Sequence, residues 1–165
     1  MQILAPAKIN LFLHVVGRRP DGYHELQTVF QLLDLCDRLT LKLRRDGEIS
    51  RSTPIEGLDT EADLCIRAAK ALQSQSGCGL GVAIGLEKRI PMGAGLGGGS
   101  SDAGATLRGL LELFPGAVEE SQLQQIAAGL GSDVPFFLSR SSLALARGRG
   151  ERIQPLPPLP AATVL

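Results

Sequence analysis

The sequence predicts an α+β fold in which a mixed sheet packs against helices. Apolar and polar residues alternate over residues 8–15, which is typical of a strand with one buried face. Apolar residues recur at helical spacing over residues 103–114, in a helix that Asp102 is expected to begin just after a glycine-rich run. Strand and helix patterns are mixed along the chain without regular alternation. This order favours an α+β arrangement over a doubly wound parallel sheet.

Further elements of the first half follow from local patterns. Strands are expected at residues 26–33, 38–44 and 82–88. The turn Pro20-Asp21-Gly22 precedes the first of these, because proline presets φ and glycine tolerates positive φ. A helix is expected to begin near Thr60, where Thr60-x-x-Asp63 has the form of a capping box.

The second half adds one shorter helix and a pair of strands. The helix is expected at residues 121–130, ending at Gly131, and the strands at 136–138 and 143–146. The proline-rich stretch 155–160 is either a PxxP ligand or, more often, a stiff connection between domains. We therefore expect one domain over residues 1–154 and a connection over 155–165.

Composition narrows the class of protein. The chain has 165 residues, 44% of them hydrophobic, and 17 basic residues balance 17 acidic ones. This is typical of a folded, cytoplasmic domain and gives no indication of a nucleic-acid or membrane partner, since both normally require basic excess. Cys36, Cys65 and Cys78 are odd in number and lack Cys-x-x-Cys spacing, so neither a disulfide framework nor a metal site is expected. Oligomeric state stays open.

The most informative stretch is a run with five glycines in seven residues. It comprises Pro91, Met92, Gly93, Ala94, Gly95, Leu96, Gly97, Gly98, Gly99, Ser100 and Ser101. A glycine loop that leads into a helix brings unpaired N–H groups and the positive end of the helix dipole toward an anion. We expect these residues to bind the phosphates of a nucleotide.

Three other interpretations of the run are weaker. A Walker loop requires lysine where Ser100 follows Gly99. The spacing Gly93-x-Gly95-x-x-Gly98 fits a dinucleotide fingerprint, but residues 87–91 separate the preceding strand from the glycines. A surface turn without function would not need so many glycines, because each one costs chain entropy.

The glycine-rich run and three other segments together resemble the GHMP small-molecule kinases. These segments are Ala5-Pro6-Ala7-Lys8-Ile9-Asn10-Leu11-Phe12-Leu13, Arg19-Pro20-Asp21-Gly22-Tyr23-His24-Glu25-Leu26 and Gly131-Ser132-Asp133-Val134-Pro135-Phe136-Phe137. The resemblance implies a GHMP-kinase-like N-terminal domain, similar to domain 2 of ribosomal protein S5. Family members continue for roughly another domain with a third glycine-rich motif, and we expect that half to follow this chain.

Within the family, the second segment is similar to members that act on a cytidine diphosphate alcohol. The resemblance implies transfer of the γ-phosphoryl group of ATP, with Mg²⁺, to the 2-hydroxyl of that alcohol in the non-mevalonate route to isoprenoids. Two alternatives stay open. One is a related kinase for another small alcohol, and the other is a nucleotide-binding domain without catalytic activity.

The resemblance also implies roles for individual residues. Asp133 would accept or orient the hydroxyl proton, and Lys8 would stabilise negative charge beside it. Asn10, Tyr23 and His24 would bind the substrate. Without the family, the same residues are interpreted as a solvated lysine, a turn-forming aspartate and ordinary polar or aromatic neighbours. His14 matches no catalytic motif and is interpreted as structural.

Three further positions have a helix-capping alternative. Ser100 and Ser101 either contact phosphate, hold Mg²⁺ near Ser101 or cap the helix that follows. Asp63 stands where many family members have asparagine. Capping explains an aspartate there, whereas a free carboxylate facing the phosphates would oppose ATP.

Overall fold

The computed structural model describes residues 1–18, 20, 22, 24–52, 54–55, 57, 59–77, 79 and 81–160. In this part of the chain the strands are β1 (Gln2–Arg18), β2 (His24–Arg44), β3 (Ile49–Arg51), β4 (Gly81–Glu87), β5 (Leu143–Gly148) and β6 (Arg152–Pro155). The helices are α1 (Leu64–Ser76), α2 (Gly98–Leu113), α3 (Glu120–Leu130) and α4 (Val134–Leu138). The predicted α+β class with a mixed sheet is confirmed.

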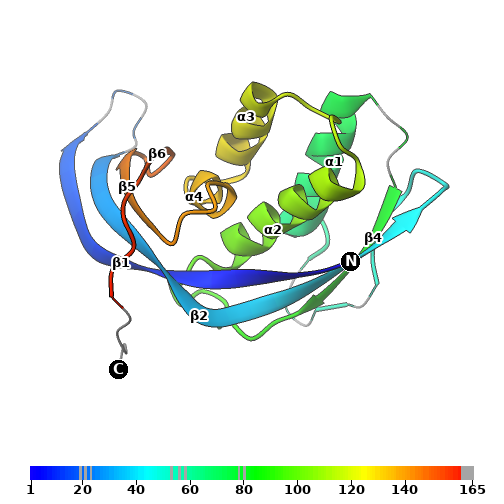
Figure 1. Cartoon of the computed structure of the whole chain (residues 1–165), viewed down its shortest axis with the longest axis horizontal. Helices are drawn as coiled ribbons and strands as arrows, with labels where there is room; N and C mark the ends of the chain where they lie inside the picture. Colours follow the sequence, from blue (N-terminus) through cyan, green and yellow to red (C-terminus); the bar gives the residue numbers. More distant parts are fainter. Residues whose placement is uncertain are drawn as a thin grey trace.

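The strands form one sheet around β2, and the helices lie together on one side of it (Figure 1). β2 pairs with β1 along most of its length, with β5 over residues 26–31 and with β4 over residues 38–44, always antiparallel. β3 adds to the outer edge of β4 in parallel, and β6 pairs with β5. β2 therefore connects the two ends of the sheet.

The prediction of two separate strands over residues 26–44 was wrong, because β2 runs through both without a break. Buried side chains fall at Thr28 and Phe30, but further along at Asp37, Leu39 and Leu41. The buried positions thus change from even-numbered to odd-numbered residues in mid-strand, where the register against β1 also shifts. Such a change of phase interrupts the period-two pattern and resembles the end of a strand.

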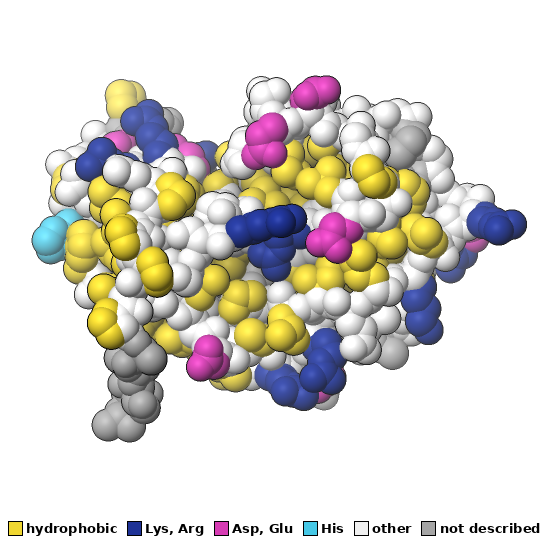
Figure 2. All heavy atoms as spheres, viewed as in Figure 1, with side chains coloured by type: hydrophobic (Ala, Val, Ile, Leu, Met, Phe, Trp, Pro, Cys, Tyr) yellow, Lys and Arg dark blue, Asp and Glu magenta, His cyan; other side chains and the backbone are white. Residues whose placement is uncertain are grey.

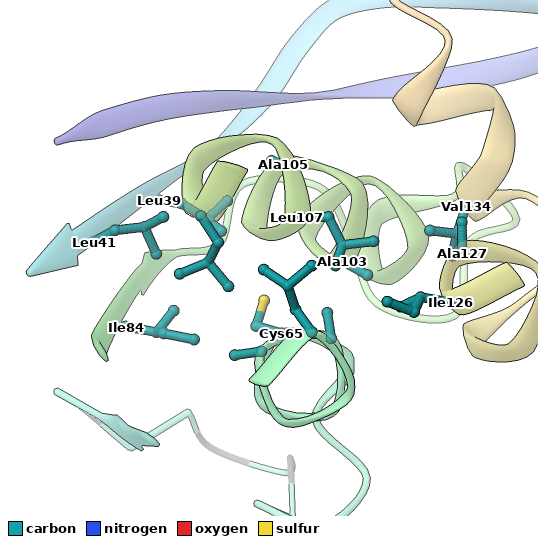
Figure 3. Close-up of a cluster of buried hydrophobic side chains, with 14 of the residues drawn as sticks. Leu39, Leu41, Cys65, Ile84, Ala103, Ala105, Leu107, Ile126, Ala127 and Val134 are labelled. Atoms are coloured by element: carbon teal, nitrogen blue, oxygen red, sulfur yellow. The ribbon is translucent and has the colours of Figure 1, made fainter. Parts of the chain in front are cut away.

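The main core lies between α1, α2 and the half of the sheet formed by β4 and the end of β2 (Figure 3). Leu39 and Leu41 of β2 and Ile84 of β4 face Cys65 of α1 and Leu107 of α2. A second cluster lies under α4 and contains Phe30, Phe136, Phe137, Ala144 and Ala146. The helices are therefore anchored at two separate places on the sheet.

Glycine allows α2 to approach the sheet closely. A Cβ at Gly109 would lie 2.2 Å from Ile3 Cδ1 and 2.5 Å from Leu41 Cδ1. A Cβ at Gly104 would lie 2.8 Å from Phe137 Cβ. Close packing at Gly109 fixes the height of α2 above the sheet, and close packing at Gly104 fixes the distance of α2 from Phe137 of α4. Together they fix the position of the glycine-rich run.

Two helices begin at residues other than those predicted. α1 begins at Leu64 instead of Thr60, because Asp63 itself is the N-cap and its carboxylate accepts a hydrogen bond from Cys65 N. α2 begins at Gly98, where glycines already have helical geometry, and Ser101 N donates to Gly97 O. Asp102 therefore lies inside the helix and does not begin it. The predicted shorter helix agrees with α3.

The strand predicted at residues 136–138 is wrong, because these residues belong to α4. Pro135 stands in the first turn of α4, where its missing N–H group is not needed. Phe136, Phe137 and Leu138 are all buried, and a short apolar run cannot be assigned to strand or helix from periodicity alone. β3 and β6 were not predicted. The predicted strand at 143–146 agrees with β5.

The outer half of β1 also differs from the expectation of a half-buried strand. Leu13 and Val15 are 53% and 61% exposed, whereas Lys8 is only 6% exposed. Figure 2 shows hydrophobic side chains at the end of the molecule where β1, β5 and β6 lie.

In the described part of the chain, the helices are too short or too polar to cross a membrane.

Candidate functional site

The glycine-rich run forms a loop between β4 and α2. Gly93, Gly95 and Gly97 have φ angles of 75°, 74° and 72°, which L-residues with side chains rarely adopt. The first intrahelical hydrogen bond of α2 runs from Ser101 N to Gly97 O, so the N–H groups of residues 98–100 precede the helical ladder. The loop thus ends in N–H groups that are available to an anion.

A cavity of about 230 Å³ lies against this loop. Its apolar lining includes Leu64, Leu86, Pro91 and Met92, and Gly93, Gly95, Gly97, Gly98 and Gly99 of the loop also line it. The remaining lining residues are Ala62, Asp63, Cys65, Lys88, Ala94, Leu96 and Asp102. Apolar side chains together with backbone N–H groups suit a ligand with a flat base and phosphates.

Lys8 is bound to the loop by both its main chain and its side chain. Lys8 N donates to Leu96 O at 2.9 Å, and Lys8 Nζ donates to Gly95 O at 3.0 Å. Its ammonium group also lies 5.2 Å from the centre of the Phe30 ring. A buried ammonium needs such partners, because the charge has been removed from water. The loop and the lysine are consequently placed by the same contacts.

Asp133 lies close to Lys8 although the two residues are far apart in the sequence. Asp133 is the residue before α4, and its Oδ2 lies 3.5 Å from Lys8 Nζ. The Asp133 side chain is 26% exposed, so one part of the carboxylate faces solvent. Ser132 Oγ donates to Asp133 Oδ1 at 3.2 Å. An acceptor and a cation thus meet beside the glycine loop.

Asn10 joins this pair from the same strand. Lys8 Nζ donates to Asn10 Oδ1 at 2.8 Å, and Asn10 Nδ2 donates to Thr28 Oγ1 at 2.7 Å. The structure therefore brings Asp133 together with Lys8 and Asn10, which are far from it in the sequence. His24 lies at the start of β2, and Tyr23 falls outside the described residues.

A buried charge cluster lies below the loop. Lys88 Nζ donates to Asp37 Oδ2 at 2.5 Å and to Asp102 Oδ2 at 2.9 Å. The other oxygen of Asp37 accepts from Arg89 N and Ile90 N, which fixes the chain leading into the loop. Burial raises the pKa of Asp102 to about 7, although the bond from Lys88 opposes the shift. Burial alone would lower the pKa of Lys88, but its bonds to the two carboxylates raise it.

Asp63 lines the cavity with its charge compensated. One oxygen accepts from Cys65 N, and the other is paired with the Arg51 guanidinium. The helix-capping interpretation of Asp63 is therefore confirmed. Because Arg51 neutralises the carboxylate, an anionic ligand in the cavity does not meet an uncompensated charge there.

Residues 63–141, which contain the loop, α2 and Asp133, match the family model described as the GHMP kinases N terminal domain. The chain carries a GHMP kinase N-terminal domain. Its glycine loop, β1 lysine and the aspartate before α4 all belong to this domain or contact it.

Curated relatives narrow the similarity to one kind of GHMP kinase. A 4-diphosphocytidyl-2-C-methyl-D-erythritol kinase of Burkholderia thailandensis is 56% identical over 151 residues, covering 92% of this chain and 51% of that protein. The enzyme of the same name from Pseudomonas syringae pv. tomato is 54% identical over 154 residues, covering 93% of this chain and 54% of that protein. The chain thus spans about half the length of the curated relatives it matches.

Solved structures agree with this assignment. A crystal structure of 4-(cytidine 5'-diphospho)-2C-methyl-D-erythritol kinase superposes with a TM-score of 0.82 at 47% identity, covering 94% of this chain and 55% of that one. The mevalonate kinase of Methanococcus jannaschii reaches a TM-score of 0.65 at 15% identity, covering 96% of this chain and 56% of that one. The second similarity shows a common fold only.

Three residues that line the cavity or contact its neighbours were not predicted from the sequence. Lys88 and Asp102 line the cavity, and Thr28 contacts Asn10 below the loop. A lysine after a strand and a threonine within one carry no signal of such contacts. The run Gly99-Ser100-Ser101-Asp102 did draw attention to Asp102, but only as the start of a helix.

Proposed function

We propose that the whole protein, consisting of this chain and the second half that its relatives have, is an ATP-dependent kinase. It transfers the γ-phosphoryl group of ATP to the 2-hydroxyl of 4-diphosphocytidyl-2-C-methyl-D-erythritol, a step in the non-mevalonate route to isoprenoids. The observation that carries this proposal is the meeting of Lys8 and Asp133 at 3.5 Å beside the glycine loop of a GHMP domain. The names of relatives at 54–56% identity support the choice of substrate.

ATP would bind across the glycine loop. The apolar lining residues Leu64, Leu86 and Met92 suit the adenine base. The N–H groups of residues 98–100 and the α2 dipole suit the phosphates. A Cβ at Gly98 would lie 3.0 Å from Ile90 Cγ2 and 3.2 Å from Lys88 Nζ, so the loop needs glycine there to keep its shape. The residues assigned to ATP are those of the run 91–101.

The catalytic residues would be Lys8 and Asp133. Asp133 accepts the proton of the 2-hydroxyl as that oxygen bonds to the γ-phosphorus and the bond to the ADP oxygen breaks. Lys8 stabilises the negative charge on the transferred group, at a point where its ammonium is already held by Gly95 O. Little other chemistry is required, because phosphoryl transfer depends mainly on positioning and charge stabilisation.

The alcohol substrate would lie beside β1 and the start of β2. Asn10 keeps one amide hydrogen and one lone pair beyond its bonds to Thr28 and Lys8, and these can contact the substrate. His24 has both a donor and an acceptor for the cytosine edge, and Tyr23 has a ring for stacking on the base. The exposed start of β2 is compatible with contact between His24 and a ligand.

Mg²⁺ would enter with the nucleotide and neutralise phosphate charge. Clusters of three or more His, Cys, Asp or Glu side chains suited to a metal do not occur in the described part of the chain. Ser101 Oγ is buried without a hydrogen-bond partner there, so its oxygen fits a role near the metal. Mg²⁺ typically takes few protein ligands and keeps water and phosphate oxygens. The balanced charge of the chain suits a cytoplasmic enzyme with small-molecule partners and no nucleic acid.

The deciding experiment is phosphoryl transfer from γ-labelled ATP by the whole protein. Diphosphocytidyl-methylerythritol is the test substrate, and homoserine, mevalonate and galactose are the comparison alcohols. Labelled product from the cytidine substrate alone supports the proposal. Product from another alcohol alone would identify a related GHMP kinase. Tight binding of MgATP without transfer to any alcohol would identify a nucleotide-binding domain.

A further inference from the structure

A hydrogen-bonded chain connects Lys8 to a threonine buried in the sheet. Lys8 Nζ donates to Asn10 Oδ1 at 2.8 Å, and Asn10 Nδ2 donates to Thr28 Oγ1 at 2.7 Å. Thr28 Oγ1 donates in turn to Phe12 O at 2.6 Å. Thr28 is 1% exposed and lies on β2 opposite β1, so water does not compete for these contacts. This series of hydrogen bonds therefore ends at the carbonyl group of Phe12, where water is excluded.

The direction of every hydrogen bond follows from the last one. A backbone carbonyl only accepts, so the single hydrogen of the Thr28 hydroxyl is used by Phe12 O. Thr28 Oγ1 must then accept from Asn10, and the donor end of the Asn10 amide faces Thr28. The acceptor end faces Lys8, which has only donors. A reversed amide would place donor against donor at Lys8.

This orientation determines what Lys8 offers the reaction. An ammonium group has three hydrogens, and two of them are directed at Asn10 Oδ1 and Gly95 O. The third is left for Asp133 and the space beside it, where Asp133 Oδ2 lies 3.5 Å away. With a reversed Asn10 amide, Lys8 would lose one of its two fixed partners and would no longer be directed at the same point.

We propose that Thr28 is a positioning residue for phosphoryl transfer, because its buried hydroxyl sets the orientation of the Asn10 amide and thereby the direction of the Lys8 ammonium. This inference rests on the proposed function, in which Lys8 acts on the transferred group. Thr28 touches neither nucleotide nor alcohol in this arrangement. Its effect on the reaction passes through Asn10 alone.

The local irregularity of β1 makes this contact possible. The pairing of β1 with β2 shifts register between Asn10 and Phe12, which leaves Leu11 as an extra residue on β1. At this bulge the carbonyl of Phe12 meets the Thr28 side chain. The Thr28 hydroxyl therefore bonds both to the backbone of β1 and to Asn10 of the site. An apolar residue of equal size can fill the same space but cannot form these hydrogen bonds.

The test compares Thr28→Val with Thr28→Ser in the whole protein. Thr28→Val keeps the shape and removes the hydroxyl, so we expect kcat to fall roughly ten- to hundredfold, the effect of leaving a buried donor unsatisfied. KM for ATP should change less than twofold, since the glycine loop is untouched. Thr28→Ser keeps the hydroxyl and should restore kcat to within about threefold of the wild-type value. Thr40→Val, the same change farther along β2, is the control and should leave kcat unchanged.

The outcomes separate this inference from the proposed function. If Lys8→Ala abolishes transfer while Thr28→Val retains wild-type kcat, the role of Thr28 is wrong and the proposed function stands. If Lys8→Ala retains wild-type kcat, the catalytic role of Lys8 and the inference for Thr28 are wrong, while the proposed transfer reaction stands. If the wild-type protein transfers no phosphoryl group to the alcohol, the proposed function itself is wrong. Equal losses of kcat in Thr28→Val and Thr28→Ser would also overturn the inference, because the hydroxyl would then not be what matters.

A measurement on the wild-type protein tests the same point if Thr28→Val does not fold. The two side-chain amide hydrogens of Asn10 can be followed by NMR, with the signal assigned by its loss in Asn10→Ala. The hydrogen bonded to Thr28 should exchange with solvent at least tenfold more slowly than the other. Equal, fast exchange of both hydrogens would show that the amide is not held and would overturn the inference.

Discussion

Replacing Gly97 with alanine should reduce catalysis through Lys8. Position 97 has a φ of 72°, where a residue with a Cβ is strained by about 1–2 kcal/mol. The added Cβ would also lie 3.1 Å from both Lys8 Cγ and Lys8 Cε and 3.0 Å from Phe137 Cζ. Because α2 and α4 fix Phe137, the flexible lysine is the group that yields. A displacement of the ammonium by a fraction of an ångström is enough to disturb a transfer that depends on positioning.

Gly93→Ala is the matched control. Gly93 has a φ of 75°, but a Cβ there would meet nothing within 4 Å. Both variants carry the backbone strain, and only Gly97→Ala also displaces Lys8. With saturating MgATP and diphosphocytidyl-methylerythritol, we expect kcat to fall roughly ten- to hundredfold in Gly97→Ala and less than threefold in Gly93→Ala. Equal kcat values in the two variants would refute the argument, since strain would then account for the whole effect.

Four further outcomes are expected. Asp133→Asn should lower kcat by roughly 10²–10⁴-fold in steady-state assays, and a loss below tenfold would exclude Asp133 as the proton acceptor. Gly109→Ala should lower the free energy of unfolding by about 1–3 kcal/mol in urea titrations through overpacking against the sheet, whereas Gly129→Ala, in open space on α3, should raise it by about 0.5–1 kcal/mol. Burial raises the pKa of Asp102 to about 7, so the folded chain binds more protons than the unfolded one between about pH 4 and 7, and this carboxyl makes stability fall as pH rises. Asp102→Asn should flatten that slope in urea titrations at pH 5 and pH 8, and an unchanged slope would contradict the assignment. Burial raises the pKa of Cys65 to about 11, so mass spectrometry should find it unalkylated by iodoacetamide at pH 8 until the chain is unfolded.

The sequence was sufficient for the fold class. The roles of the motif residues stay a prediction, although Lys8, Asn10 and Asp133 do lie together beside the glycine loop. The alternation in β1 and the glycine run are patterns of neighbouring residues, and the structure contains the strand and the loop that they predict. The failures arise where burial depends on partners far away in sequence. Phe136 and Phe137 are apolar enough for a strand, but Pro135 and the packing of α4 on the sheet make them helical.

The same limit applies to the contacts that support the site. Lys8 appeared to belong to a solvated strand face, yet it is buried because the glycine loop folds over it. Thr28 reaches Asn10 through a register shift between β1 and β2 that no periodicity records. Lys88 meets Asp37 and Asp102 only after β4 and α2 have packed on β2. Each of these pairings is a property of the sheet as assembled.

The exchange of partners along β2 divides the domain into two cooperative units. Residues 26–31 are held by β5 and the cluster under α4, whereas residues 38–44 are held by β4 and the core under α1 and α2. Between them, β2 pairs with β1, and Leu32 N also donates to Ser142 O. We expect amide hydrogens of the two stretches to exchange with deuterium as two groups with different opening free energies. α2 reaches both units, because Gly97 at its start lies against Lys8 and Phe137, whereas Gly109 near its other end lies against Leu41. The helix that follows the glycine loop therefore couples the opening of one unit to the other.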